Sequence, residues 1–116
     1  MVILNSSLRC FQRVGKMTEK ERIDRLFQAI SCLESKEECL DFFADLCTEK
    51  EVSEFAKRFE AAIMLSRGEN YNTVTAELGL STATISRVSK CLSKGPGGYK
   101  KALEKLQNAE NNAENK

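Results

Sequence analysis

Apolar residues recur three and four positions apart along most of the chain, the spacing typical of amphipathic helices. Thr18-Glu19-Lys20-Glu21 and Thr48-Glu49-Lys50-Glu51 are capping boxes, in which two side chains satisfy free N–H groups at a helix start. Gly95-Pro96-Gly97-Gly98 is the strongest helix breaker. Together these signals predict six helices, over about residues 18–33, 35–47, 48–68, 71–78, 82–94 and 99–107.

Composition supports an all-α fold. The 116 residues include one Pro and six Gly, fewer turn residues than an all-β domain of this size needs. We expect a flexible leader over residues 1–16, one helical domain over 17–107 and a disordered, Asn- and Glu-rich tail over 108–116. A domain this small buries a limited fraction of its surface, so a dimer that adds buried area is expected.

Residue usage also restricts the chemistry. The chain has no His, which excludes Ser–His and Cys–His nucleophiles and removes the commonest metal ligand. The five Cys include no C-x-x-C pair, which indicates free thiols in a reducing cytoplasm and no zinc site. No apolar run is long enough to cross a membrane. We therefore predict a cytoplasmic protein that is not an enzyme, with no metal and no membrane partner.

Charge is distributed unevenly although the net charge is only +1. Residues 17–70 contain 8 basic and 13 acidic residues, whereas residues 71–106 contain 6 basic and 2 acidic ones. An acidic body joined to a basic segment is typical of small DNA-binding proteins.

The basic segment has the pattern of a helix-turn-helix. Val74 and Leu78 form the inward face of its first helix, and Gly79 stands where the turn needs a left-handed residue. Ser81 is a good N-cap for the second helix. Ile85, Val88 and Leu92 follow at i, i+3 and i+7, so they face the core. The helix-turn-helix is expected over about residues 71–94.

The opposite face of the second helix is suited to DNA. Small side chains near its start allow close approach to base edges, and Arg or Lys further along can meet phosphate or guanine. The predicted DNA-binding residues are Ser81, Thr82, Ala83, Thr84, Ser86, Arg87, Lys90 and Lys94. Two alternatives remain: a helical module that binds protein, and a helical hairpin without a DNA role. Tyr99, Lys100 and Lys101 form either a solvated helix start or a contact to the DNA backbone.

The sequence resembles the Trp-repressor-like family, and more closely its YerC/YecD branch of bacterial proteins. The matching residues are Leu46, Thr48-x-x-Glu51, Arg58, Arg67-Gly68-Glu69, Glu77-Leu78-Gly79, Ala83-Thr84-Ile85-Ser86-Arg87 and Ser89. The resemblance covers about residues 18–107. It implies an all-α fold of six helices, an intertwined homodimer, and two recognition helices in successive major grooves of a palindromic double-stranded DNA operator, about 34 Å apart. The implied function is a sequence-specific transcriptional repressor.

The resemblance also implies a small-molecule corepressor site between Arg58 and Arg87, with Thr48, Thr84 and Cys91 around it. The Trp repressor has Gly where this chain has Val88, and Ser where it has Cys91. Both departures argue against tryptophan as the ligand, and they favour a filled pocket or a different small corepressor. In the alternative reading, Arg58 pairs with Glu51 or Glu54, and Arg87 meets phosphate. No other cofactor is expected.

Overall fold

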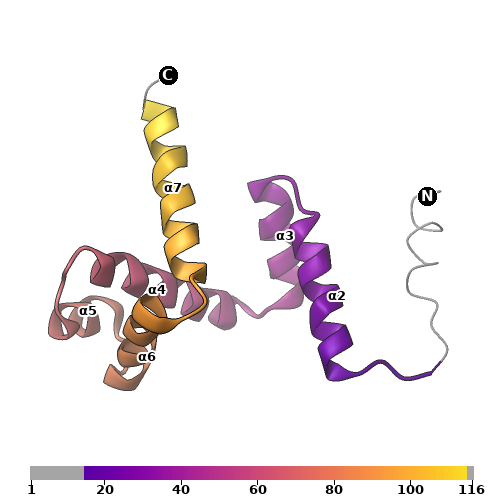
Figure 1. Ribbon diagram of the computed structural model, residues 1–116, viewed down its shortest axis with the longest axis horizontal. Coiled ribbons are helices and arrows are strands. Elements are labelled where there is room, and N and C mark those ends of the chain that lie inside the picture. The colour runs from indigo at the N-terminus through magenta and orange to yellow at the C-terminus, as the bar shows by residue number, and fades with distance from the viewer. Residues whose placement is uncertain (1–14, 115–116) are drawn as a thin grey trace. The chain divides into compact units, whose positions relative to one another are not determined.

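The computed structural model describes residues 15–114, which form six α-helices and no strands (Figure 1). The helices are α2 (Glu19–Ser31), α3 (Lys36–Leu46), α4 (Glu49–Ser66), α5 (Tyr71–Leu78), α6 (Thr82–Lys94) and α7 (Gly98–Glu114). The all-α prediction is confirmed. The predicted flexible leader lies outside the described residues, except for its last two positions. The described residues divide into two compact units, with the boundary between Phe43 and Ala44.

Both predicted capping boxes are present and set the first residues of α2 and α4. The backbone N–H of Thr48 donates to Glu51 Oε1 at 2.8 Å, and the Glu51 N–H donates to Thr48 Oγ1 at 3.1 Å. Thr18 and Glu21 make the same reciprocal pair at 3.0 and 3.1 Å. These bonds satisfy N–H groups that have no partner inside the helix, so each helix begins where its local sequence indicates.

The N-terminal unit contains α2 and most of α3, and neither helix has a buried residue. Ile23 is 48% exposed, Phe27 60% and Leu40 58%. The apolar residues of these helices are therefore not buried by the described residues of their own unit.

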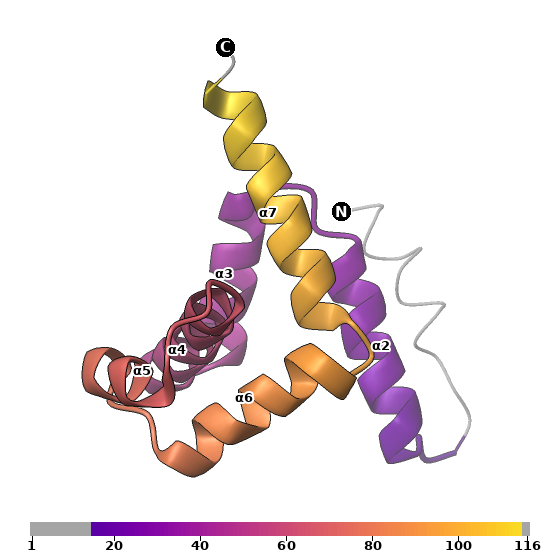
Figure 2. The ribbon, with the colours of Figure 1, turned by 60° about the vertical axis from the view of Figure 1, so that its left-hand side comes forward.

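The core lies in the second unit, where the C-terminal half of α4 packs against α5 and α6 (Figure 2). Its buried members are Ala61, Ala62, Met64, Val74, Leu80, Ile85 and Val88. The two alanines were not predicted as core. Their small side chains let the helix–turn–helix approach α4 closely. Val52 and Phe55, apolar residues in the first half of the same helix, are 37% and 45% exposed, because the packed helices cover only its C-terminal half.

α7 extends to Glu114, whereas the sequence pattern predicted a helix end near Gln107 and disorder from Asn108. Backbone bonding within a helix needs no apolar anchor, and the Ala and Glu residues of this stretch are adequate helix formers. Gln107 Nε2 also donates to Asn111 Oδ1, one turn on, at 3.2 Å. The segment 108–114 is therefore an exposed helix and not a disordered tail. Between residues 15 and 114, no helix is both long and apolar enough to span a bilayer.

Candidate nucleic-acid interface

The predicted helix-turn-helix is formed by α5 and α6. Gly79 ends α5 in the left-handed conformation, with φ 67° and ψ 23°, and its N–H donates to the carbonyl of Thr75 at 2.9 Å. Non-glycine residues adopt this conformation at a cost. Leu80, 6% exposed, then enters the core and orients the turn. The start of α5 is fixed by Asn70, whose Oδ1 accepts from the Thr73 N–H at 2.9 Å.

Ser81 caps α6, as predicted. Its Oγ accepts from the backbone N–H of Thr84 at 3.2 Å and donates to Thr84 Oγ1 at 3.0 Å. The hydroxyl of Thr84 is thus engaged within the first turn of α6, and the residue is half-buried. The Thr84 side chain therefore stabilises the start of the helix. Its contact with DNA stays a prediction.

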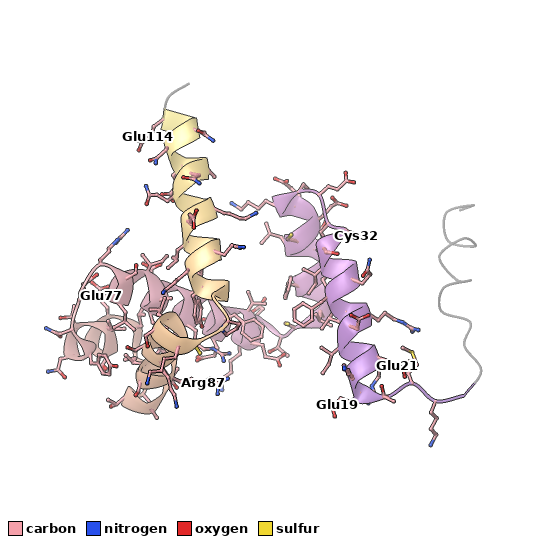
Figure 3. The ribbon with its side chains drawn as sticks, viewed as in Figure 1. Glu19, Glu21, Cys32, Glu77, Arg87 and Glu114 are labelled. Carbon is pink, nitrogen blue, oxygen red and sulfur yellow. The ribbon has the colours of Figure 1, made fainter. Side chains whose placement is uncertain are left out.

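The remaining predicted DNA-binding residues share one open surface, the reading face, defined here as Thr82, Ala83, Ser86, Arg87, Lys90 and Lys94. All six are exposed, and Figure 3 shows Arg87 on α6. On the other side of the helix, Ile85 is 0% and Val88 2% exposed. The reading face includes three cations and no acid. It is an exposed, positively charged strip on a helix that is held in place by its buried side.

Two neighbouring residues of the predicted small-molecule site lie in different environments. Val88 is part of the core and fills space beside Arg87, which stays on the surface. Arg58 is half-buried, and its guanidinium carbon lies 5.2 Å from the centre of the Phe55 ring, a cation–π contact. Phe55 as a partner of Arg58 was not predicted, although its position three residues earlier on the same helix is a signal for such a contact.

The acids proposed as alternative partners of Arg58 are used elsewhere. Glu54 Oε1 lies 3.6 Å from Lys57 Nζ. Glu51 completes the Thr48 capping box, and the Thr48 backbone N–H, followed by the Thr48 hydroxyl, lowers the pKa of the Glu51 carboxyl. In the described part of the chain, Arg58 contacts the Phe55 ring and forms no ion pair with Glu51 or Glu54.

A hollow of about 720 Å³ occurs in the second unit, away from the predicted ligand residues. Its lining includes Leu65, Tyr71, Ser89, Leu92, Ser93, Lys100 and Leu103, with Glu69 and Glu104 among its polar residues. None of Thr48, Arg58, Arg87, Val88 and Cys91 lines it. This hollow is therefore not formed by the five predicted ligand residues. The sequence pattern did not indicate it.

Cysteine and acidic side chains form no metal centre in residues 15–114: no group of three potential ligands is suitably placed. Cys32, Cys39, Cys47 and Cys91 are free thiols, and Cys91 is half-buried on α6. The chemistry that the site offers is therefore hydrogen bonding and charge, supplied by hydroxyl groups, one guanidinium and two ammonium groups.

Comparisons with known proteins agree with this geometry. The family model described as Trp repressor protein matches residues 21–107. The uncharacterized protein YerC of Bacillus subtilis (strain 168) is 42% identical over 104 residues, which cover 90% of this chain and 99% of YerC.

Two solved structures are also similar. A TrpR-like protein from Eubacterium eligens ATCC 27750 is 40% identical with a TM-score of 0.70, covering 77% of this chain and 92% of that one. A putative Trp repressor from Staphylococcus aureus is 40% identical with a TM-score of 0.68, covering 79% and 96%. The family is one of DNA-binding regulators, not of enzymes. The chain therefore belongs to the Trp-repressor-like family, in the branch that contains YerC.

Proposed function

We propose that this protein is a sequence-specific transcriptional repressor that binds an operator as a homodimer through α5 and α6. The observation that carries the proposal is the reading face: six exposed residues on α6, three of them cationic, on a helix whose opposite side is locked into the core. The proposed function involves no catalytic step. Repression follows from occupation of the operator by the protein in the cytoplasm.

The two ends of the reading face have different proposed roles in DNA binding. Thr82, Ala83 and Ser86 are small, so the start of α6 enters a major groove deeply enough for methyl and hydroxyl groups to meet base edges. Arg87, Lys90 and Lys94 supply contacts to phosphates or to guanine. Ser81 and Thr84 act indirectly, because their side chains bond to one another at the helix start.

Dimer formation is supported by apolar side chains that the described residues of each unit leave exposed. Phe27 and Leu40 are 60% and 58% exposed, and α2 and α3 have no buried residue. Val52 and Phe55 add an exposed apolar stretch at the start of α4. Large exposed apolar side chains of this kind, present in each unit, are typical of interaction sites. In our proposal a second copy of the chain covers them, as the family relationship implies.

The proposed repressor does not respond to tryptophan. Val88 is 2% exposed within the core, so the space beside Arg87 is already filled by a side chain of the protein. Arg58 is engaged with Phe55. A preformed, filled site removes the need for a small molecule to order α6. Addition of L-tryptophan should leave the affinity for DNA unchanged, and a tenfold or greater increase would contradict this part of the proposal.

The first experiment is selection of bound fragments from genomic DNA by the full chain at physiological salt, without added ligand. We expect one palindrome with half-sites about one helical turn apart. Lys90→Ala/Lys94→Ala should bind all sequences more weakly, because the lost contacts are to phosphates. The matched control is Lys20→Ala/Lys36→Ala, which removes the same charge outside the unit that carries α6. Equal weakening by both variants, or no preferred sequence for the wild type, would overturn the proposal.

A second variant tests base reading. Replacing Ala83 with Leu puts a bulky side chain at the start of the reading face, so it should reduce binding to the selected palindrome more than binding to random DNA. Equal loss on both kinds of DNA would show that Ala83 does not face bases. Sedimentation equilibrium on the same samples reports the oligomeric state, for which a stable monomer at micromolar concentration would be the contrary result.

A further inference from the structure

Positive charge continues beyond α6 into the next helix. From Ser81 to Leu103 the chain contains five cationic residues and no Asp or Glu. Three of them belong to the reading face, and the other two are Lys100 and Lys101, in the first turn of α7. The proposed function uses the first three and leaves these two lysines unexplained.

The first turn of α7 is held next to α6 by apolar packing. Tyr99 is half-buried and packs against the core of the second unit. Leu92 of α6 and Leu103 of α7 line the same hollow. α7 follows α6 directly along the chain (Figure 2). Because α7 contacts both α4 and α6, the lysines that follow Tyr99 keep a defined position relative to α6.

That position borders the reading face. Lys100 lines the hollow together with Ser89 and Ser93 of α6. In the sequence, Ser89 and Ser93 directly precede Lys90 and Lys94 of the reading face. Each serine therefore lies 100° around the helix from its lysine. The hollow therefore lies between Lys100 of α7 and the two α6 serines that precede the lysines of the reading face.

The two α7 lysines are available for a ligand. Both are exposed, and neither forms a salt bridge within the described part of the chain, in contrast to Lys57 with Glu54 at 3.6 Å. Glu69 and Glu104 line the hollow beside Lys100 and reduce the positive potential there. Lys101 does not line the hollow and stands three residues before Glu104 on the same helix, with no salt bridge between the two.

We propose that Lys100 and Lys101 form a second phosphate-binding surface, which extends the reading face of α6 along the backbone of the bound DNA. The inference rests on the proposed function, because it assigns further contacts to the same DNA complex. Such contacts carry no sequence information, but they add affinity and set the orientation of the protein on the duplex. They also increase the dependence of binding on salt, since each neutralised phosphate releases counterions.

The test compares Lys100→Ala/Lys101→Ala with wild type and with the charge-matched control Lys20→Ala/Lys36→Ala. Fluorescence anisotropy measures the affinity for a random duplex and for the selected palindrome. The salt concentration is varied between about 50 and 300 mM, a range in which phosphate contacts make the affinity strongly salt-dependent. We expect the α7 variant to bind both duplexes on the order of tenfold more weakly, with a slope of log affinity against log salt smaller by about 1–2. The control should match wild type.

The outcomes separate this inference from the proposed function. If wild type shows no salt-dependent DNA binding, the proposed function fails. If wild type binds and the α7 variant has the wild-type slope, or the control changes the slope equally, the second surface is refuted. Circular dichroism of both variants shows whether α7 remains folded. A variant that loses helix is replaced by Lys100→Gln/Lys101→Gln, which removes the charge but keeps an unbranched polar side chain, and the same criteria apply.

Discussion

Arg87 and Val88 are adjacent in α6 but lie in opposite environments. The Arg87 side chain is exposed on the reading face, while Val88 is 2% exposed among Ala61, Ala62 and Ile85. Successive helical residues are 100° apart, so one step along the chain leads from solvent into the core. The contact that α6 makes with DNA and the packing that holds α6 in place therefore depend on neighbouring side chains.

Val88→Ala should lower the free energy of unfolding by about 2 kcal/mol, because it removes two buried carbon groups and leaves a cavity in the core. Urea denaturation followed by circular dichroism measures the change. Ser86→Ala, on the exposed side of the same helix, should change the value by less than about 0.5 kcal/mol. Equal effects of the two substitutions would show that α6 is not anchored through Val88.

Gly95→Ala should destabilise the corner between α6 and α7. A Cβ at Gly95 would collide with the backbone carbonyl oxygen of Cys91, and backbone cannot move aside as a flexible side chain can. We expect a loss of about 1–3 kcal/mol, typical of an overpacked site. Gly98→Ala is the control, since its Cβ would meet nothing within 4 Å, and stability should stay the same or rise slightly. Thermal unfolding of both variants decides the matter, and a harmless Gly95→Ala would refute the steric argument.

Ser81→Ala should cost about 1 kcal/mol, the usual value for losing an N-cap. The substitution removes the acceptor for the Thr84 N–H and the hydroxyl that donates to Thr84 Oγ1. Amide hydrogen exchange in the first turn of α6 should accelerate, while exchange in α4 changes only as far as global stability does. Thr82→Ala, which removes no capping bond, serves as the comparison. Unchanged exchange at Thr84 would argue against the cap.

The capping box at the start of α4 makes stability depend on pH. The Thr48 N–H stabilises the charged form of Glu51, so the pKa of this carboxyl is lower in the folded chain than its ordinary value of 4.5. A depressed folded-state pKa contributes stability that is fully present above pH 4.5 and is lost as pH falls through the folded value. Glu51→Gln keeps a capping acceptor but cannot titrate.

The difference in unfolding free energy between wild type and Glu51→Gln should therefore be largest above about pH 4.5 and shrink toward pH 3. Denaturation at several pH values measures it. Glu49→Gln, in the same turn, controls for the loss of a charge near a helix start. A difference that stays constant from pH 6 to pH 3 would be incompatible with the lowered pKa.

Local sequence signals determined the six helices and the residues at which several of them begin. Thr18, Thr48 and Ser81 cap the helices that they were expected to cap, and Gly79 occupies the turn. The alternation of inward and outward residues in α6 also followed from periodicity, because Ile85 and Val88 are buried and Arg87 and Lys90 exposed. Capping bonds and helical periodicity involve residues within four positions of one another, so a sequence contains the information for both.

Only the tertiary structure decided which apolar faces are covered. Val52, Phe55 and Met64 are all apolar residues of α4, but α5 and α6 pack on its C-terminal half, so Met64 is buried and the first two are exposed. Helical periodicity did not indicate that Glu54 pairs with Lys57 and not with Arg58. It also did not indicate that Lys100 and Ser93 line the same hollow. These relationships depend on side-chain orientation and on how helices cross, which are settled by packing between segments distant in sequence.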